Sequence, residues 1–326
     1  MQKSIETPVL FLVFNRPEKT KLSFDAIRNA RPKKLYIAAD APRDNNPDDE
    51  MLCRKVREIV INIDWECETH YLFHENNLGC SLSGKIAWDW FFSQEDEMIF
   101  IEDDAVPCVS FFYYCQELLE KYRYDNRIAY IGGVNYGLKY GPYSYFFTRQ
   151  CAATYSMATW KRVYKLYEYN MDSYLFVRNS KTFQNNFCSE FSYKVHLRKW
   201  DKYICSIKEG RRLNTYDIQM IYLVYKNNMY CIYPNANMVS NIGLDRGGAN
   251  NDIDPKSKLA LKFGNRPRYE INEIIHPKEL FIDKKFEKKM YKQRVLYDQP
   301  LIIAKSKYYL DPIASVIYQK IKGIIK

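Results

Sequence analysis

The sequence predicts an α/β fold in which a mostly parallel, Rossmann-like sheet is covered by helices on both faces. Short apolar runs alternate with helical patterns through the first 135 residues, as expected for consecutive strand–helix–strand units. The connections between these units are short, and polar residues follow directly after several of the apolar runs. Because parallel strands end at the same edge of a sheet, these polar residues are expected to meet there.

The first strand–helix unit is marked by an apolar run and a proline. Residues 8–14 (PVLFLVF) are apolar over the length of a strand, and residues 15–17 (NRP) interrupt them. Pro17 suits the first turn of a helix, where the N–H that proline lacks would have no partner. Apolar residues then recur at helical spacing to about residue 30, so the pattern predicts a strand followed by a helix.

The alternation continues through four more strands. The expected strands are residues 34–39 (KLYIAA), 70–74 (HYLFH), 98–101 (MIFI) and 128–131 (IAYI). The helices between them are expected from apolar residues at helical spacing, namely Leu52, Val56, Ile59 and Val60, then Leu82, Ile86 and Trp90, then Phe111, Leu118 and Leu119. The polar clusters that follow strands directly are Asn15-Arg16, Asp40 and Glu102-Asp103-Asp104.

The second part of the chain is irregular and rich in Tyr and Phe. Residues 216–228 are expected to form a helix, and residues 229–233 (MYCIY) a strand that Pro234 ends. The residues after Gly243 are rich in Gly, Asn and Asp, which indicates a loop. Between residues 313 and 325, isoleucines share one helical face with lysines around them, which predicts an amphipathic helix.

Composition disfavours several classes of protein. The chain has 326 residues, 47% of them hydrophobic and 27% charged, as in ordinary globular proteins. No run approaches the roughly 18 apolar residues of a membrane span, and residues 8–14 are a poor signal peptide. The nine cysteines are odd in number and show no C-x-x-C spacing, which disfavours a disulfide framework or a zinc ribbon.

The positive charge is concentrated at the C-terminal end. Residues 256–326 contain 17 Lys and Arg against 7 Asp and Glu, a surplus equal to the net charge of +10 on the whole chain. A nucleic-acid surface would spread basic residues through the domain, so nucleic acid is not expected as a partner. A basic, amphipathic tail instead favours an anionic membrane surface. The alternative is a helix that docks on its own domain with its lysines in solvent.

The acidic triplet indicates how a phosphate ligand would be bound. The sequence has neither a G-x-G-x-x-G nor a G-x-x-x-x-G-K-[ST] motif, so a glycine-rich loop does not cradle phosphate here. The carboxylates of Glu102, Asp103 and Asp104 repel one another and favour a bound cation. Mn²⁺ or Mg²⁺ takes oxygen ligands and bridges carboxylates to phosphates. The alternative is that the triplet is a solvated loop or a helix N-terminus.

Two further polar residues have a choice of roles. Asp40 could accept hydrogen bonds from a base or a ribose, and Arg16 could contact a base or a phosphate. Alternatively, Asp40 opens an Asx-type turn and Arg16 is a surface residue. Taken singly, neither residue decides between these interpretations.

An ordered set of short segments resembles a family of bacterial sugar transferases. The segments are residues 8–20 (PVLFLVFNRPEKT), 35–43 (LYIAADAPR), 77–80 (NLGC), 99–104 (IFIEDD) with Pro107 and 110–112 (SFF), 158–161 (ATWK), 217–219 (DIQ) and 241–243 (NIG). They span roughly the first 245 residues and are similar to the nucleotide-binding half of glycosyltransferases of the N-acetylglucosaminyltransferase I type. The resemblance implies a GT-A fold, a UDP-sugar donor, a divalent metal ion and inversion at the anomeric carbon.

The resemblance also implies which residues bind the donor and the metal ion. The assigned residues are Arg16 and Asp40 for the uridine, Glu102 and Asp103 for the ribose and donor sugar, Asp104 for Mn²⁺ or Mg²⁺, and Asn15 and Ser83 as further nucleotide-sugar contacts. Members of this family usually carry a histidine after the Asn-Ile-Gly segment, whereas residues 243–252 (GLDRGGANND) have none.

Inversion requires one base that removes the proton of the acceptor hydroxyl on the face opposite the diphosphate. Asp217 matches the acidic position of the family that serves as this base. Its alternative role is an N-cap at the start of the helix expected over residues 216–228. Asp245, Glu190 and Asp201 remain alternative bases.

The sequence therefore predicts an inverting, metal-dependent glycosyltransferase that moves a sugar from a UDP-sugar to a glycan or lipid-linked glycan in surface polysaccharide synthesis. Residues 1–135 are expected to bind the nucleotide-sugar, residues 136–255 the acceptor within the same GT-A domain, and residues 256–326 to form a basic extension. A cytoplasmic location, with peripheral attachment to the inner face of the membrane, suits both substrates. The alternatives are a non-catalytic glycan- or membrane-binding protein on the same fold, and a metal-dependent nuclease, which the ordered strand-end motifs disfavour.

Overall fold

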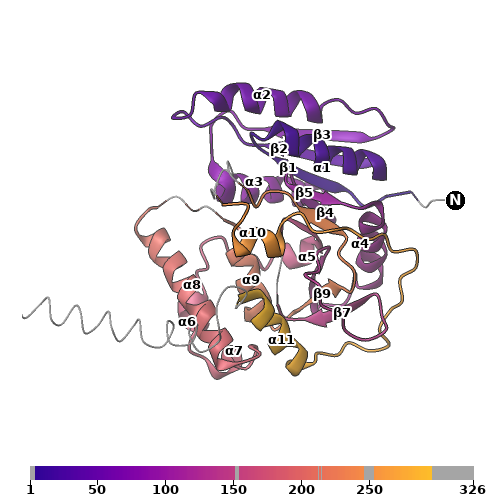
Figure 1. The fold of residues 1–326 in the computed structure, drawn as a ribbon. Helices are drawn as coiled ribbons and strands as arrows, with labels where there is room; N and C mark the ends of the chain where they lie inside the picture. Colours follow the sequence, from indigo (N-terminus) through magenta and orange to yellow (C-terminus); the bar gives the residue numbers. More distant parts are fainter. Residues whose placement is uncertain (1–3, 151–153, 212, 214, 246–252, 296–326) are drawn as a thin grey trace, which may run out of the picture.

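The computed structural model describes residues 4–150, 154–211, 213, 215–245 and 253–295 (Figure 1). The strands are β1 (Val9–Val13), β2 (Lys34–Ala39), β3 (Glu68–Phe73), β4 (Glu97–Glu102), β5 (Ala105–Pro107), β6 (Ile128–Gly132), β7 (Tyr145–Thr148), β8 (Ser156–Trp160), β9 (Tyr230–Pro234) and β10 (Val239–Asn241). The helices are α1 (Pro17–Ala30), α2 (Asp48–Val60), α3 (Gly79–Gln94), α4 (Val109–Lys121), α5 (Lys161–Tyr164), α6 (Tyr174–Val177), α7 (Lys181–Gln184), α8 (Glu190–Lys208), α9 (Asp217–Lys226), α10 (Lys258–Phe263) and α11 (Lys284–Val295).

The central sheet has eight strands within the described part of the chain, in the order β3-β2-β1-β4-β8-β6-β9-β7. β3, β2, β1 and β4 are parallel neighbours, and β6 is parallel to β9. β8 lies antiparallel between β4 and β6, which therefore run in the same direction, and β7 is antiparallel to β9 at one edge. The predicted mostly parallel α/β sheet is confirmed.

Helices cover both faces of this sheet, as predicted. Phe11 of β1 stacks on Phe24 of α1, with ring centroids 6.3 Å apart. Phe11 pairs with Ile37 of β2, so the side chain of the preceding residue, Tyr36, points to the opposite face. There Tyr36 packs edge-to-face on Phe91 of α3, with centroids 4.8 Å apart. α1 and α3 therefore lie on opposite faces of the sheet.

The buried side of α3 differs from the apolar stripe that predicted this helix. Leu82 is exposed, and Ile86 and Trp90 are only partly buried. The buried residues of α3 are Ser81, Ser83, Gly84, Ala87, Trp88, Phe91 and Phe92. Several of these side chains are small, which lets the helix pack closely on its neighbours. Because apolar residues surround most of the helix, their spacing predicted the helix but not its inward side.

The strand register brings the predicted polar clusters to one edge of the sheet. Val13, at the end of β1, pairs with Ala39, at the end of β2. Leu12 pairs with Glu102, the last residue of β4. The residues that follow these three strands therefore leave the sheet at the same carboxyl-terminal edge, where ligands bind in open α/β folds.

The aromatic region that the pattern leaves unassigned forms β7, β8 and the helices α5 to α8. A second core of buried aromatic and apolar residues lies in this part, comprising Met171, Tyr174, Phe183, Phe187, Trp200, Tyr203, Ile204, Tyr222 and Tyr225. The helix and strand expected over residues 216–233 are α9 and β9, and β9 extends to include Pro234. A small second sheet pairs β10 with β5, with Asn241 opposite Ala105. This pairing returns the chain to the residues that follow β4.

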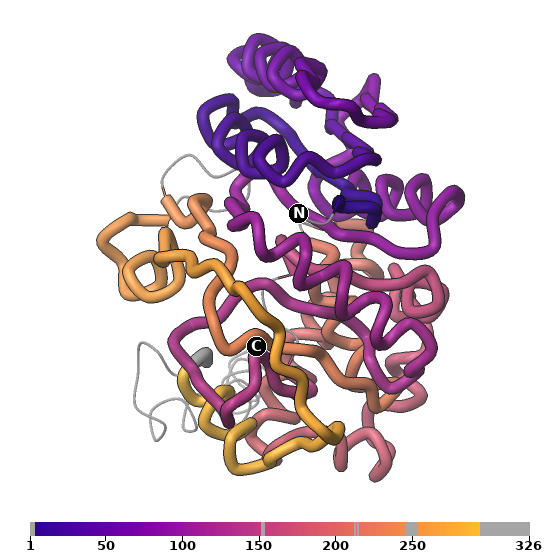
Figure 2. The backbone as a smooth tube through the Cα atoms, turned by 90° about the vertical axis from the view of Figure 1, so that its right-hand side faces the viewer, coloured from indigo at the N-terminus to yellow at the C-terminus, as the bar shows by residue number. Residues whose placement is uncertain are grey.

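The described part of the C-terminal region, residues 253–295, packs against the rest of the chain (Figure 2). The carboxylate of Glu270 accepts hydrogen bonds from the N–H groups of Val109 (3.1 Å) and Ser110 (2.7 Å) at the start of α4. Met290 and Tyr291 of α11 are buried. The isoleucine-rich helix expected near residue 320 lies outside the described residues. In the described part, no helix is both long enough and apolar enough to span a bilayer.

Candidate functional site

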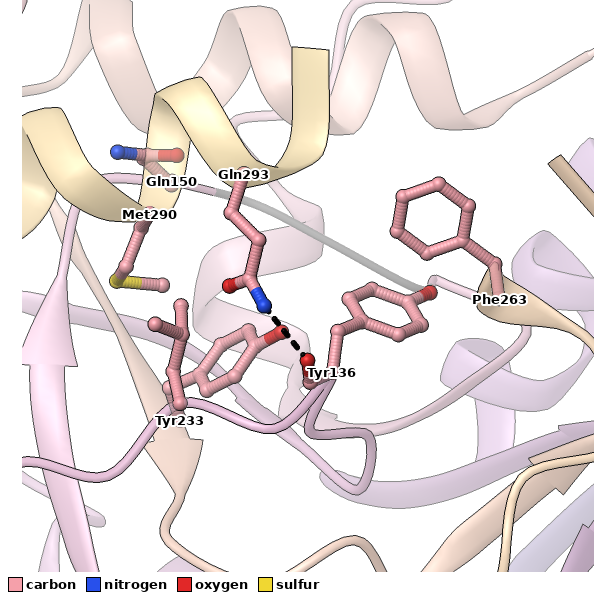
Figure 3. A pocket seen from close by; sticks show the side chains of 7 residues that line it. Tyr136, Gln150, Tyr233, Phe263, Met290 and Gln293 are labelled. Atoms are coloured by element: carbon pink, nitrogen blue, oxygen red, sulfur yellow. Dashed lines mark hydrogen bonds between the residues drawn. The ribbon is translucent and has the colours of Figure 1, made fainter. Parts of the chain in front are cut away.

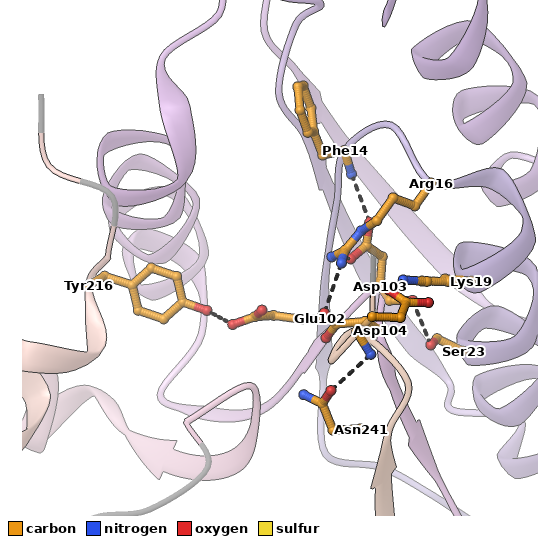
Figure 4. Close-up of polar contacts among 11 residues, drawn as sticks. Phe14, Arg16, Lys19, Ser23, Glu102, Asp103, Asp104, Tyr216 and Asn241 are labelled. Atoms are coloured by element: carbon orange, nitrogen blue, oxygen red, sulfur yellow. Dashed lines mark hydrogen bonds and ion pairs between the residues drawn. The ribbon is translucent and has the colours of Figure 1, made fainter. Parts of the chain in front are cut away.

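Arg16 binds the last two carboxylates of the acidic triplet (Figure 4). Its Nη1 lies 2.9 Å from Oδ2 of Asp104, and its Nη2 forms an ion pair with Oδ1 of Asp103. Burial acts to lower the pKa of Arg16, but the charges of Asp103 and Asp104 outweigh it and raise the pKa. Arg16 occupies the N-cap position of α1. The turn after β1 thus supplies a positive charge to the turn after β4.

Asp103 is engaged on all sides by the protein. It is 3% exposed. Besides binding Arg16, its carboxylate accepts a hydrogen bond from the N–H of Phe14 (3.4 Å), and its carbonyl accepts one from the hydroxyl of Ser23 (2.8 Å). Burial raises the pKa of Asp103, and the charge of Arg16 opposes this shift. These contacts hold the turn after β4 against β1 and α1.

Glu102 points away from its acidic neighbours and toward Tyr216, the N-cap residue of α9 (Figure 4). Tyr216 donates a hydrogen bond from its hydroxyl to Oε1 of Glu102. Burial raises the pKa of Glu102 well above its usual value, and the charges of Asp104, Asp103 and Asp217 add to this shift. The contribution of Asp217 reflects how near the start of α9 lies to the end of β4. The three carboxylates of the triplet therefore have three different surroundings.

Asp104 has an unused acceptor. Its Oδ1 is buried and has no hydrogen-bond partner among the described residues. The N–H of Ile242 donates to the carbonyl of Asp104 (2.8 Å). Gly243 follows, and it lies so close to the carboxylate that a Cβ at this position would overlap Oδ2. The segment after β10 therefore sets the orientation of Asp104, and it requires glycine at position 243.

The surroundings of Asp104 fit a metal ion that arrives with a ligand of its own. A buried carboxylate oxygen without a partner is a suitable ligand for Mn²⁺ or Mg²⁺. Among the residues that the structure describes, no three His, Cys, Asp or Glu side chains gather into a metal-binding group. Mg²⁺ is commonly held by one or two carboxylates together with substrate phosphates. Asp104 therefore fits that arrangement rather than a site built from protein ligands alone.

Asp40 holds the N-terminus of α3. Its Oδ1 accepts hydrogen bonds from the N–H groups of Ala41 (2.9 Å) and Leu78 (2.9 Å). Its Oδ2 accepts from the N–H of Gly79 (2.7 Å) and from the side-chain amide of Asn77 (3.2 Å). A carboxylate offers about four lone-pair sites, and these four donors use them. A uridine that contacted the Asp40 carboxylate would have to replace one of these bonds.

Asn15 is likewise tied into the scaffold of the edge. Its side-chain amide donates to Oδ1 of Asp49 (2.8 Å), at the start of α2. The same carboxylate binds the guanidinium of Arg43, with Nη2 at 3.0 Å. Burial acts to raise the pKa of Asp49, but Arg43 and Asn15 outweigh it and lower the pKa. Asn15 and Arg43 therefore fix the loops after β1 and β2 relative to each other.

Ser83 and its neighbour Gly84 lie on the buried side of α3. The hydroxyl of Ser83 is buried and has no partner among the described residues. Gly84 lies beneath the ring of Tyr216, and a Cβ at Gly84 would be 2.7 Å from Cδ1 of that ring. The hydroxyl of Ser81 donates to the carbonyl of Thr215 (2.6 Å). α3 therefore packs against the residues that lead into α9.

Asp217 is the first residue of α9 rather than its N-cap. Tyr216 occupies the N-cap position and makes no side-chain capping bond. The carboxylate of Asp217 instead accepts a hydrogen bond from the hydroxyl of Thr215. It is partly buried. The capping role considered for Asp217 is therefore not the one that it has in this structure.

The three alternative bases are all engaged by cations. Asp245 forms an ion pair with Lys19 of α1, which Figure 4 shows beside the triplet. Glu190 pairs with Lys194 along α8, with 2.8 Å between Oε1 and Nζ. Asp201 pairs with Arg178, with 2.8 Å between Oδ2 and Nη2. The carboxylate of Asp217 is instead bound by the neutral hydroxyl of Thr215.

Sequence reasoning did not identify Tyr216, Lys19 or Tyr155 as members of this region. Burial raises the pKa of Tyr155 well above its usual value, and the charges of Tyr136 and Asp104 add to it. The Tyr155 and Tyr136 hydroxyls lie 3.3 Å apart. These tyrosines are among 29 in the chain, and nothing in their spacing marks them as members of the site.

Two cavities lined by described residues lie away from the triplet. A small one of about 10 Å³ is shown in Figure 3. Tyr136, Phe263 and Met290 are among its lining residues, and the side-chain amide of Gln293 donates to the Tyr136 carbonyl (2.8 Å). Its volume is about that of one water molecule. A larger cavity of about 700 Å³ adjoins residues 6–8 and Glu97, at the opposite edge of the sheet, and none of the predicted site residues lines it.

Comparisons with known proteins add little to this geometry. No protein-family model and no curated protein sequence matches the chain. S. aureus TarS 1-349 aligns with a TM-score of 0.31 and 12% identity over 49% of this chain and 48% of that one, so the chain spans about half the length of that structure. The mannosyltransferase PcManGT from Pyrobaculum calidifontis, in complex with GDP-Man and Mn²⁺, aligns with a TM-score of 0.35 and 9% identity over 69% and 70% of the two chains.

A UDP-glucose pyrophosphorylase complexed with UDP-glucose aligns with a TM-score of 0.24 and 11% identity, over 39% of this chain and 56% of that one. At such values the likeness carries no argument about function. The class of the protein therefore rests on its own features, which are a mostly parallel α/β sheet with an acidic, arginine-bound site at the carboxyl-terminal edge.

Proposed function

We propose that the protein is an inverting, metal-dependent glycosyltransferase whose donor is a UDP-sugar. The observation that carries this proposal is the pairing of Arg16 with Asp104 at the carboxyl-terminal edge of the sheet, beside Glu102, which Tyr216 links to the start of α9 and so to Asp217. Arg16, Asp104 and Asp217 come from the ends of β1 and β4 and the start of α9. Their motifs are also the ones that resemble bacterial sugar transferases. Displacement of a diphosphate needs at least a cationic side chain, a metal ligand and a general base.

The donor would bind at the carboxyl-terminal edge. Arg16 would contact the nucleotide through its guanidinium, and Glu102 and Asp103 would face the ribose and donor sugar. A ligand that reached the buried carboxylate of Asp103 would have to replace its contact with Arg16 or with the N–H of Phe14. Asp104 is the residue that would hold Mn²⁺ or Mg²⁺, whose chemistry there is to neutralise the charge on the leaving diphosphate. The hydroxyl of Ser83, which has no partner in the described part of the chain, and the loops held by Asn15 and Asp40 would complete the donor side.

The transfer is a single displacement at the anomeric carbon. The Asp217 carboxylate takes the proton from the acceptor hydroxyl, and the acceptor oxygen forms a bond to the anomeric carbon. The bond from that carbon to the diphosphate oxygen breaks, and its electron pair leaves with the UDP. Because attack and departure are on opposite faces, the configuration inverts. Tyr216 supports this step by joining the start of α9 to Glu102.

The acceptor side is proposed on chemistry alone. The part after β6, which is rich in tyrosine, would bind a glycan or a lipid-linked glycan used in surface polysaccharide synthesis. Residues 296–326 lie outside the described structure. Their isoleucines and lysines remain the basis for proposing attachment to an anionic membrane surface on the cytoplasmic side.

Donor hydrolysis tests the proposed activity without knowledge of the acceptor. The full chain is incubated with a panel of UDP-sugars, with Mn²⁺ or with a chelator, and released UDP is measured. We expect metal-dependent release from at least one UDP-sugar. If every UDP-sugar binds in calorimetry but none is hydrolysed or transferred, catalysis is excluded and only binding remains.

The second candidate is a non-catalytic glycan- or membrane-binding protein on the same fold. One observation favours it: the proposed base already accepts a hydrogen bond from the hydroxyl of Thr215, which occupies one of the lone-pair sites that could receive the acceptor's proton. The absence of a histidine from residues 243–252 points the same way. Glycan-array binding without UDP release would favour this candidate over the transferase.

A further inference from the structure

Arg16 occupies the position at which two ligands of the proposed reaction would meet. Its Nη1 is 2.9 Å from Oδ2 of Asp104, the carboxylate that would hold a metal ion. Its guanidinium is also the group that would contact a nucleoside diphosphate. In the structure these two groups bind each other. The metal ion and the nucleoside diphosphate can therefore each make all their contacts only after the ion pair between Arg16 and Asp104 breaks.

The geometry around Asp104 makes the pair an obstacle to a cation. The side chains of Arg16 and Asp104 retain 18% and 12% of their exposure, so their charges interact more strongly than in water. Gly243 is packed against Oδ2, and Oδ1 is the oxygen that has no partner in the described part of the chain. A divalent ion at Oδ1 would share its carboxylate with a guanidinium. Repulsion between the two cations disfavours that state.

The pair also leaves Arg16 incompletely satisfied. Its Nε is buried and has no hydrogen-bond partner among the described residues. Guanidinium groups bind phosphate oxygens through two parallel hydrogen bonds. A diphosphate at this edge would offer Arg16 acceptors that Asp103 and Asp104 do not supply. The diphosphate would therefore both draw Arg16 away from Asp104 and supply phosphate oxygens as ligands for the metal ion.

We propose that Arg16 is an internal counter-cation that keeps free divalent metal ions from Asp104 until a nucleoside diphosphate binds its guanidinium. This proposal rests on the proposed function, because it concerns the same site. It makes the site selective for a metal–nucleotide complex over the metal ion alone. A nucleotide that binds Arg16 frees Asp104 for the metal ion, and a metal ion at Asp104 frees Arg16 for the nucleotide. The two ligands therefore bind cooperatively.

Metal binding in the absence of nucleotide tests the proposal directly. Mn²⁺ alone is titrated into the wild type and into Arg16→Gln, and bound Mn²⁺ is measured by electron paramagnetic resonance. Coupling between close charge pairs is strong enough that Arg16→Gln should bind Mn²⁺ at least about tenfold more tightly than the wild type. Adding Asp104→Asn to Arg16→Gln should abolish this gain, which assigns the site.

Arg28 offers a matched control on α1. It also bridges two aspartates, Asp25 at 2.7 Å and Asp64 at 3.0 Å, but on the surface. Arg28→Gln should leave Mn²⁺ affinity at the wild-type value. Equal Mn²⁺ affinity in the wild type and Arg16→Gln would overturn the proposal. So would an equal gain in Arg28→Gln.

A second variant covers the case in which Arg16→Gln does not fold. A lysine has one point charge and cannot span both aspartates as the guanidinium does, so Arg16→Lys should show a smaller gain in Mn²⁺ affinity of the same sign. No gain in folded Arg16→Lys would then overturn the proposal. UDP titrations of the wild type are a separate arm. If UDP fails to bind with Mn²⁺, the proposed function fails, whereas the Mn²⁺ titrations still decide the role of Arg16.

Discussion

Tyr216 and Glu102 are hydrogen-bonded to each other although 114 positions separate them in the sequence. Tyr216 is buried, with its ring against Gly84 and 5.3 Å from the ring of Trp88 between centroids. Asp217 follows it directly. This contact therefore joins the end of β4, which carries the acidic triplet, to the start of α9, which carries the proposed base.

The close approach of Gly84 to Tyr216 predicts the cost of one methyl group. In Gly84→Ala the new Cβ would be 2.7 Å from Cδ1 of Tyr216. Overpacking of this kind destabilises folds by about 1–3 kcal/mol, and we expect that loss in urea unfolding. Gly132→Ala is the control, because its Cβ would have its nearest neighbours at 3.5 Å. Equal losses in both variants would show that Tyr216 yields freely.

The four hydrogen bonds to Asp40 predict a structural effect of a small change. Asp40→Asn would turn an amide group toward N–H donors at the start of α3 and leave some of them unsatisfied. We expect a loss of about 2–3 kcal/mol in the free energy of unfolding. Asp44→Asn, in the exposed part of the following loop, should change it little. Unchanged stability in Asp40→Asn would contradict the role assigned to these four hydrogen bonds.

The burial of the Glu97 carboxyl group predicts a pH dependence of stability. Burial raises the pKa of Glu97, and Arg123 opposes the shift. The folded protein therefore keeps this proton to higher pH than the unfolded chain does, so the contribution of Glu97 to stability falls as pH rises above its unfolded pKa. Glu97→Gln cannot ionise. It should gain stability relative to the wild type as pH rises from about 4 to about 7.

Glu168 provides a control of opposite sign for that experiment. Burial acts to raise the pKa of Glu168, but Lys226 and Ser173 outweigh it and lower the pKa. Its stabilising contribution is present above the unfolded pKa and is lost as pH falls. Glu168→Gln should therefore lose stability relative to the wild type over the same rise in pH. Parallel trends in the two variants would contradict the assigned pKa directions.

The position of Asp217 predicts a separation of binding from turnover. Asp217→Asn should lower turnover by about two orders of magnitude or more while donor affinity stays unchanged, as expected for a lost base. Asp201→Asn and Asp245→Asn test the alternative bases, which are held by Arg178 and Lys19. A near wild-type rate in Asp217→Asn would assign the base elsewhere.

The fold of the first 135 residues, in which strands and helices alternate, could be predicted because its buried strands are largely uninterrupted apolar runs. Residues 34–39 were expected as a strand and form β2 with the same bounds. β8 was not predicted, because its sequence, SMATW, mixes small and polar residues. Its partners in the sheet, β4 and β6, lie far from it in the sequence. Strands defined by distant pairing leave little local signal.

The candidate site was predictable to a similar extent. The edge shared by Arg16, Asp40 and the acidic triplet follows from strand topology alone. The partners of these side chains do not, because sequence order gives no sign that Arg16 pairs with Asp104 or that Tyr216 reaches Glu102. The saturated carboxylate of Asp40 is likewise visible only once the start of α3 is placed.

Calorimetric titration of UDP into the full chain, with and without Mn²⁺, tests the central claim most directly. We expect UDP to bind with Mn²⁺ and to bind much more weakly without it. Asp104→Asn should retain the wild-type fold by circular dichroism but lose the effect of Mn²⁺ on UDP affinity, because it removes the carboxylate whose Oδ1 has no other partner in the described structure. Mn²⁺-dependent UDP binding of equal affinity in the wild type and Asp104→Asn would contradict the account.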